Sequence, residues 1–307
     1  MREVHIGELI KQKRQELGLT QEELCEGICE PATLSRIESG KQTPSRSKLN
    51  ALLQRLGQPS QKFYAMMSEN ELEVERLKDE IIDRNARHLY TEALEKIEKL
   101  CELVEEDDHL TRQFMLRSRV LAGKMENGEV LPYSFEEKLE LLLEAIRLTI
   151  PNFDIDKIGS HWYSRDEVKI INQIGITYSD NGHKQEAAEV FRPLMKFVRE
   201  KMIKNPDVIA TAILVAYNYC LVLSQLEQYE EAADVAHWGW DKCVEWSRTG
   251  ALGGLLFVIG KCLYKTGHVE ESKDYLMQSY YAFRSMRNKR DTEAVRKDIK
   301  EYYNIDL

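Results

Sequence analysis

Apolar and polar positions alternate along most of the chain at the spacing of amphipathic helices. Apolar side chains recur every three or four residues in segments of about 12 to 18 residues, each ending at a polar or glycine-containing turn. Alternating Val, Ile or Thr runs are rare, and only seven prolines interrupt the helical spacing. The pattern therefore predicts an all-α fold.

The first 57 residues are divided into four short segments, and the chain breaks after them at Gly57-Gln58-Pro59. Thr20 and Glu23 have the spacing of a capping box, and Gly40 is placed to end a helix in the left-handed region. The predicted helices are Ile6–Leu17, Gln21–Glu26, Pro31–Ser39 and Ser45–Leu56.

The rest of the chain contains a degenerate repeat. A turn, an acidic residue and then a small residue that opens a helix recur in the segments 87–94, 182–188, 227–233 and 266–272. We call the small residues the repeat markers; they are Ala93, Ala187, Ala232 and Ser272. A second small residue lies 12 positions before three of them, at Gly175, Cys220 and Gly260. This spacing predicts closely packed helix pairs, about five in number, stacked as a solenoid.

Composition adds a division of charge to this picture. The 307 residues are 43% hydrophobic and 31% charged, which is too apolar for a disordered chain and suggests about two domains. Residues 1–57 have nine basic and eight acidic side chains, whereas residues 58–307 have 34 and 44. The net charge of -9 excludes a general polycation that coats nucleic acid, and the near-neutral head on an acidic body suggests two separate functions.

The chain shows no sign of a membrane or secreted protein. No apolar run approaches the roughly 20 residues that span a bilayer, and the charged N-terminal segment lacks the apolar core of a secretory signal. The cysteines mostly lie within apolar helical patterns, as reduced, buried thiols do. We therefore expect a cytoplasmic protein. The six are Cys25, Cys29, Cys101, Cys220, Cys243 and Cys262.

Three segments of the head resemble the helix-turn-helix of lambda-repressor/Cro-like (XRE) regulators. They are T-Q-E-E-L at 20–24, L-S-R-I-E-S-G-K at 34–41 and T-P-S at 43–45. Between Leu24 and Glu38 the chain is one residue shorter than the usual repressor, and its turn reads E-G-I-C. This shorter form resembles the peptide-pheromone regulators of Gram-positive bacteria, the Rgg/PlcR/PrgX (RNPP) group.

The resemblance implies that the third predicted helix enters the major groove with its first turn and a half. Arg36 can donate two hydrogen bonds to guanine, and Thr33 can contact a thymine methyl group, a base or a phosphate. Gln21 matches the family position that binds a backbone phosphate, and Lys41 and Arg46 can neutralise other phosphates. The expected DNA-binding residues are Gln21, Pro31, Ala32, Thr33, Ser35, Arg36, Lys41 and Arg46.

Two further expectations concern the head. Glu38 is expected to pair within the domain instead of facing DNA. The net charge of +1 predicts modest affinity for a single head, so we expect a homodimer bound to a two-fold operator.

The repeats resemble the tetratricopeptide (TPR) array of the same regulators, in which a Cro-like head precedes a TPR body. The expected fold is therefore an N-terminal lambda-repressor-like helix-turn-helix domain followed by a TPR-like α-solenoid. Its expected parts are a DNA-binding domain at 1–68, a linker helix at 69–86 and a repeat domain at 87–307.

The inner face of such a solenoid suits an extended peptide, because an Asn side chain can both donate to and accept from a peptide backbone. In the regulators that this chain resembles, inner-face Asn residues hold a short signalling peptide. Lys169 or Lys261 could pair with a C-terminal carboxylate. The repeat frame places on this face Lys169, Asn172, Ile176, Tyr217, Asn218, Leu221, Gln225, Phe257, Lys261 and Tyr264.

No catalytic residue, metal site or cofactor is expected. Cys25 and Cys29 lack a second Cys or His pair at zinc-finger distance, and no histidines form an H-E-x-x-H motif. The glycines at 250–254 lack a preceding strand and a following G-K-[ST], so they are not expected to form a phosphate loop. The acidic run at 71–80 reads as a solvated helix face.

The sequence thus predicts a transcription regulator whose repeat body senses a short peptide and whose head binds DNA. One alternative keeps the DNA-binding head but uses the repeats to dock a protein partner. Another is a peptide-regulated phosphatase or kinase inhibitor that acts on response regulators, against which the complete Cro-like head argues.

Overall fold

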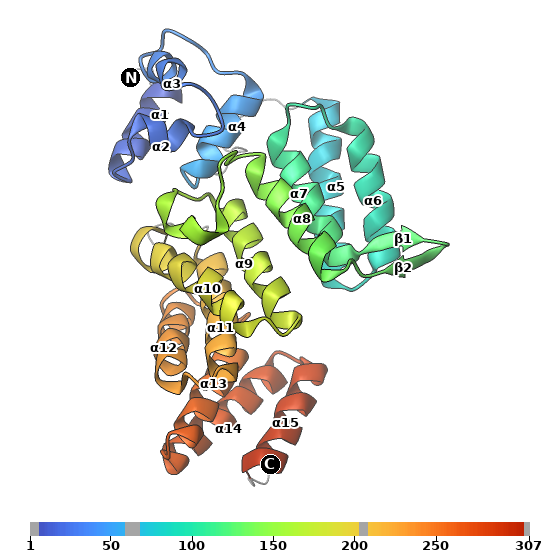
Figure 1. The fold of residues 1–307 in the computed structure, drawn as a ribbon, viewed down its shortest axis with the longest axis vertical. Coiled ribbons are helices and arrows are strands. Elements are labelled where there is room, and N and C mark those ends of the chain that lie inside the picture. Colours follow the sequence, from blue (N-terminus) through green and yellow to red (C-terminus); the bar gives the residue numbers. More distant parts are fainter. Residues whose placement is uncertain (1–5, 59–67, 203–207, 304–307) are drawn as a thin grey trace. The chain divides into compact units, whose positions relative to one another are not determined.

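The computed structural model describes residues 6–58, 68–202 and 208–303 (Figure 1). Pro59 of the predicted boundary and the outer ends of the predicted domains lie outside these ranges. The chain divides into two compact units, 1–177 and 178–307. The first holds the head and the early repeats, and the second holds the later repeats.

The head consists of four helices whose ends agree closely with those predicted. The helices are α1 (Ile6–Glu16), α2 (Gln21–Cys25), α3 (Pro31–Glu38) and α4 (Arg46–Arg55). The capping box is confirmed, because Glu23 N donates to Thr20 Oγ1 over 3.1 Å and Thr20 N donates to Glu23 Oε2 over 2.7 Å. Gly40 has the expected positive φ of 71°. The core that holds these helices together includes Ile10, Leu24, Leu34, Ile37, Leu52 and Leu53.

The repeat body continues the all-α fold and confirms it. In the first unit it begins with α5 (Glu69–Ala86), α6 (Tyr90–Leu103), α7 (His109–Ala122) and α8 (Phe135–Arg147). Helix α9 (Arg165–Asp180) crosses the boundary of the two units. The second unit contains α10 (Lys184–Phe197), α11 (Ile209–Gln225), α12 (Tyr229–Glu245), α13 (Leu252–Lys265), α14 (Val269–Ser285) and α15 (Lys289–Tyr303). A 3-10 turn (Ile155–Ser160) and a π turn (Val198–Met202) complete the described helices.

Helix α5, expected as a linker, packs as the first member of a helix pair. Its Leu77 and Ile81 are buried in the same core as Ala93 and Ile97 of α6. Figure 1 shows α5, α6 and α7 as neighbours in the first unit. We therefore propose that the repeat domain begins with α5.

The repeat motif corresponds to one recurring turn. His88, Gly182, Glu227 and Gly267 each lie five residues before a repeat marker, and each has a φ between 60° and 89°. All four repeat markers are fully buried.

The close approach of paired helices is clearest between α13 and α14. Ser272 Oγ donates to Gly260 O over 2.7 Å, and Ser279 Oγ donates to Gly253 O over the same distance. A Cβ atom on Gly260 would lie 2.8 Å from Leu276 Cγ. The small residues at the 12-residue offset therefore let the two backbones meet, as the sequence predicts.

A short β-hairpin in the first unit is the element that the sequence analysis missed. Strand β1 (Lys124–Glu126) pairs antiparallel with β2 (Glu129–Leu131), and Asn127 and Gly128 between them have φ values of 52° and 84°. A two-residue Asn-Gly loop suits such a turn because both central residues tolerate positive φ. With only three residues in each strand, the hairpin has no run of alternation long enough to predict.

Candidate DNA-binding and ligand-binding sites

Helix α3 presents a polar face beside a buried one. Leu34 and Ile37 are buried in the head core, whereas Ala32, Ser35 and Arg36 are exposed. Pro31 occupies the first turn, where its missing N–H costs no hydrogen bond, and Thr33 is half-buried. The exposed side chains can reach base edges without disturbing the core. Their role in reading DNA stays a prediction.

A buried carboxylate joins three helices of the head. Glu38 accepts hydrogen bonds from Arg14 Nε over 2.6 Å and from Arg14 Nη2 over 3.0 Å. Gln21 Nε2 donates to Glu38 Oε2 over 2.8 Å. This confirms that Glu38 pairs within the domain. It also gives Gln21 an internal partner, so the expected phosphate contact would use the remaining hydrogen-bonding capacity of its amide.

The two expected phosphate-binding cations differ in their surroundings. Lys41 is exposed on the loop after α3. Arg46 is half-buried at the start of α4, and its Nε lies 2.6 Å from Glu71 Oε1 of α5. Arg46 would therefore have to share its charge between Glu71 and a phosphate.

A buried ion pair connects the head to the repeats of the first unit. Arg55 Nη2 of α4 lies 3.0 Å from Glu167 Oε1 of α9, and both side chains are only 2% exposed. Arg55 also donates to the backbone oxygens of Leu24, Glu26 and Thr149. One side chain thus binds both the end of α2 and the repeat body.

Other contacts surround this pair, and we call the whole set the head–body junction. Gln54 Nε2 donates to Asp166 Oδ2, and His161 Nδ1 lies 3.0 Å from Glu26 Oε1. Trp162 packs against the head core. A Cβ atom on Gly27 would lie 2.0 Å from Thr149 O, so the two backbones touch. None of these contacts could be predicted from the sequence, because they join residues far apart in the chain.

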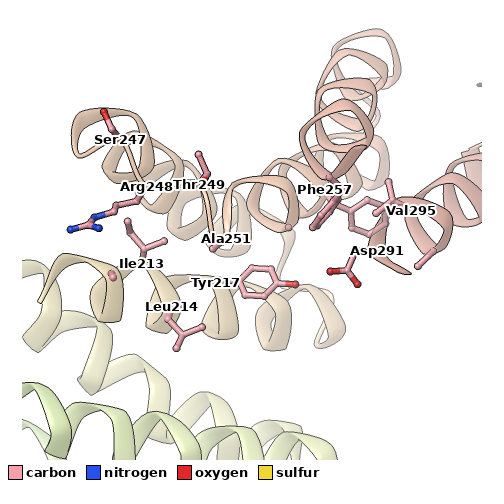
Figure 2. A pocket seen from close by; sticks show the side chains of 15 residues that line it. Ile213, Leu214, Tyr217, Ser247, Arg248, Thr249, Ala251, Phe257, Asp291 and Val295 are labelled. Atoms are coloured by element: carbon pink, nitrogen blue, oxygen red, sulfur yellow. The ribbon is translucent and has the colours of Figure 1, made fainter. Parts of the chain in front are cut away.

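The second unit contains a groove of about 720 Å³. Helices α11, α13, α14 and α15 and the turn before α13 form its walls. Figure 2 shows Arg248 at one end, and at the other the Tyr217 hydroxyl group directed towards Asp291. Its apolar lining residues include Ile213, Leu214, Tyr217, Phe257, Phe283 and Val295.

A glycine shapes the middle of the groove. A Cβ atom on Gly254 would lie 2.4 Å from Tyr217 Cε2, so the aromatic ring rests against the backbone of α13. Burial raises the pKa of Tyr217, and the nearby Asp291 charge adds to this effect. The phenol therefore stays protonated and can donate a hydrogen bond to a ligand.

The groove shares two residues with the expected peptide-binding set, whose role stays a prediction. Tyr217 and Phe257 line it. The other expected residues of α11 and α13 continue the same stripes towards the helix C-termini. Of these, Asn218, Leu221, Lys261 and Tyr264 are half-buried, and Gln225 is exposed. Burial lowers the pKa of Lys261.

The three expected ligand residues on α9 belong to the first unit. Asn172 is buried, Ile176 is half-buried, and Lys169 Nζ lies 2.7 Å from Asp166 Oδ1. These residues are not among those that line the groove.

Among the described residues, no group of three or more His, Cys, Asp or Glu side chains could hold a metal ion. Within the same ranges, every helix is too short or too polar to cross a membrane. Burial raises the pKa of Cys25 to about 11.

Comparisons with solved structures agree with this architecture. Bacillus thuringiensis PlcR in complex with the peptide PapR7 and DNA is 22% identical, with a TM-score of 0.59, over 94% of this chain and 98% of PlcR. The apo form of PlcR is 20% identical, with a TM-score of 0.60 and the same coverage. The apo form of the competence regulator ComR from Streptococcus vestibularis is 16% identical, with a TM-score of 0.55 over 96% of each chain. These likenesses establish a shared fold.

Family models give the classification. No curated protein sequence matches the chain significantly. A helix-turn-helix model matches residues 10–63, which include the four head helices from Ile10 onward. The model described as the RNPP family C-terminal domain matches residues 78–304, most of the chain. The chain therefore belongs to the RNPP family.

Proposed function

We propose that this protein is a transcription regulator that binds operator DNA through α3 and a short signalling peptide through the groove of the second unit. It acts in the cytoplasm as a homodimer on a two-fold operator. The groove carries the proposal, because it combines an apolar lining with polar groups at both ends. Membership of the RNPP family and the helix-turn-helix head support the same function.

The chemistry of the groove suits an extended peptide. Its aromatic and aliphatic lining can hold apolar side chains, and the Tyr217 hydroxyl can donate to a peptide carbonyl. Arg248 and Asp291 can pair with charges of opposite sign. We propose that the bound peptide favours one arrangement of the paired heads, by an amount equal to its differential affinity for the two states.

The test is a titration with synthetic peptides encoded by short reading frames beside the gene. Fluorescence of Trp238, Trp240 and Trp246 reports binding in the second unit, and affinity for the gene's own upstream DNA is measured in parallel. We expect a saturable response that changes DNA affinity. Tyr217→Ala and Phe257→Ala should each weaken peptide binding about tenfold, since buried aromatic anchors dominate such interfaces.

Tyr281→Ala is the matched control, because Tyr281 is an exposed aromatic residue of α14 outside the groove. Specific DNA binding without any peptide response would contradict the peptide proposal and favour a protein partner. Absence of specific DNA binding would contradict the regulator proposal itself.

A further inference from the structure

The chain contains the dipeptide Asn-Gly in two different settings. Asn127-Gly128 forms the turn between β1 and β2, and Asn181-Gly182 forms the turn between α9 and α10. All four residues are exposed. When glycine follows asparagine, its backbone nitrogen can attack the side-chain amide of the asparagine easily, because glycine has no Cβ atom to obstruct the approach. The local structure of each turn then decides whether this reaction occurs.

The hairpin turn leaves the attacking nitrogen free. Neither Gly128 N nor the Asn127 side chain has a hydrogen-bond partner among the described residues. The strands on either side are only three residues long, and a ribbon of two short strands opens readily in water. Figure 1 shows the turn at the outer end of the hairpin, away from α7 and α8. The backbone at Asn127 can therefore rotate until Gly128 N meets the side-chain carbon Cγ.

The second Asn-Gly turn is held by hydrogen bonds. Gly182 N donates to Ser179 O over 3.1 Å, and Asn181 N donates to Tyr178 O over 3.2 Å. His183 N also donates to Tyr178 O, over 3.0 Å. Freeing Gly182 N would require the end of α9 to unwind. The same dipeptide is thus closed to the reaction in one turn and open to it in the other.

We propose that Asn127 is a site of self-modification, which the folded chain converts into isoaspartate and aspartate while Asn181 persists. The proposal is independent of peptide and DNA binding. In the first step Gly128 N loses its proton and bonds to Cγ of Asn127. The bond between Cγ and Nδ2 breaks, and Nδ2 leaves as ammonia, which carries away a proton in place of the one that Gly128 N lost. The product is a cyclic succinimide.

Water opens the succinimide ring in the second step. Attack on Cγ breaks its bond to Gly128 N and gives aspartate. Attack on the main-chain carbonyl carbon of residue 127 breaks the original peptide bond and gives isoaspartate, in which the main chain runs through Cγ. The whole reaction consumes one water molecule and releases one ammonia molecule, so the solvent supplies every reactant that the chain lacks.

The modification changes the hairpin. Glu126 and Glu129 are paired directly across the ribbon, and like charges in such a pair destabilise strand pairing. Either product adds a carboxylate between them and one negative charge to the net charge of -9. Isoaspartate also lengthens the main chain by one carbon atom, so the turn no longer matches the register of the strands. The modified protein therefore favours an open ribbon.

The experiment incubates the purified full-length protein at mildly alkaline pH, in native buffer and in denaturant, and digests samples at acidic pH. Mass spectrometry quantifies the peptides that contain Asn127 and Asn181, and chromatography separates isoaspartate from aspartate. In native buffer Asn127 should react at least about tenfold faster than Asn181, because only its turn opens without unwinding a helix. In denaturant the two rates should become similar. In water enriched in heavy oxygen, each product should take up one heavy oxygen atom.

Two glycine variants form a matched pair. Gly128 and Gly182 have φ values of 84° and 86°, and no atom of the described residues lies within 4 Å of either Cβ position. Gly128→Ala should slow the reaction of Asn127 several-fold, because the new methyl group obstructs the attacking nitrogen. Gly182→Ala should leave that rate unchanged. Since alanine at positive φ strains its own turn, a loosened hairpin alone would make Gly128→Ala react faster and not slower.

Equal rates for Asn127 and Asn181 in the native protein would overturn the proposal. Aspartate without isoaspartate would indicate direct hydrolysis and overturn the attack by Gly128 N, and so would an unchanged rate in Gly128→Ala. Hydrogen exchange tests the consequence, because the modified protein should lose protection in residues 124–131. Unchanged protection would overturn the effect on the ribbon. Failure of the groove or DNA-binding proposals is distinguishable, since neither enters these measurements.

Discussion

Arg55 is the residue at which the head and the repeats of the first unit are most tightly joined. Its guanidinium binds three backbone oxygens and one carboxylate in a place almost closed to solvent. A charge in such surroundings is tolerated only with its partner, so the contribution of Glu167 is much larger than that of a surface acid.

Glu167→Gln is therefore expected to lower the free energy of unfolding of the head by about 3 kcal/mol, because it leaves Arg55 buried without a counter-charge. Chemical denaturation, followed by Trp162 fluorescence in a variant without the other tryptophans, measures this free energy of unfolding. Glu71→Gln provides the comparison, since Glu71 and Arg46 are both about a third exposed. It should cost less than about 1 kcal/mol. Similar losses of stability in the two variants would show that the buried ion pair contributes no more than the exposed one.

Thiol reactivity is a second property set at single residues. Burial raises the pKa of Cys25, Cys243 and Cys262 to about 11, whereas Cys101 is exposed. At pH 8 the raised pKa values leave little reactive thiolate. Iodoacetamide should therefore modify Cys101 first. Mass spectrometry of proteolytic peptides measures the order in which the cysteines are modified. Modification of Cys25 at the rate of Cys101 would contradict the described burial.

At the scale of elements, small residues decide how near two helices come. Gly253 and Gly260 of α13 bring its backbone within hydrogen-bonding distance of Ser279 and Ser272 of α14. The side-chain hydroxyls then donate to carbonyl oxygens of the neighbouring helix. These hydrogen bonds fix how α13 and α14 are aligned along their lengths.

Gly260→Ala is expected to destabilise the second unit by about 1–3 kcal/mol, because the new methyl group meets Leu276 at 2.8 Å. Thermal unfolding followed by Trp238, Trp240 and Trp246 fluorescence measures the loss. Gly250→Ala is the control, because nothing lies within 4 Å of its Cβ position. A loss of the same size in Gly250→Ala would attribute the effect to glycine itself and not to helix packing.

How far the elements could be predicted depends on the range of the interactions that form them. The capping box at Thr20, the turn at Gly40 and the repeat markers are local signals, and helix positions were predicted well from them. The partnership of Arg55 with Glu167 spans 112 residues, and each looks like an ordinary surface charge in its own helix. No local pattern could pair them.

The groove illustrates the same limit within single helices. Periodicity identified the face of α11 that contains Tyr217 and the face of α13 that contains Phe257. It could not show how far along each helix the groove extends, because this depends on where α15 and Phe283 close it. The expected residues Leu221, Gln225 and Lys261 thus lie on α11 and α13 but are not among the residues that line the groove.

At the scale of the whole molecule, the proposed DNA binding must work despite a net charge of -9. Only local cations on the head can then supply phosphate contacts, and salt dependence separates these from base contacts.

Arg36→Ala should weaken operator binding by about 1–3 kcal/mol while leaving binding to random DNA almost unchanged, since we expect Arg36 to contact a base. Lys41→Ala should weaken binding to both and reduce the salt slope by about one. Fluorescence anisotropy over a range of salt concentrations gives both quantities. Equal loss on operator and random DNA in Arg36→Ala would assign that residue to phosphate.

The contact between Gly27 and Thr149 has a consequence for protein engineering. Domains that are connected only by a linker can be exchanged between related proteins. This head, in contrast, is in van der Waals contact with its own repeats. A chimera that grafts the first 58 residues onto the body of another regulator would bury an arginine without its acid and press two backbones together. Exchange of operator specificity is therefore better attempted by transplanting the exposed side chains of α3 alone.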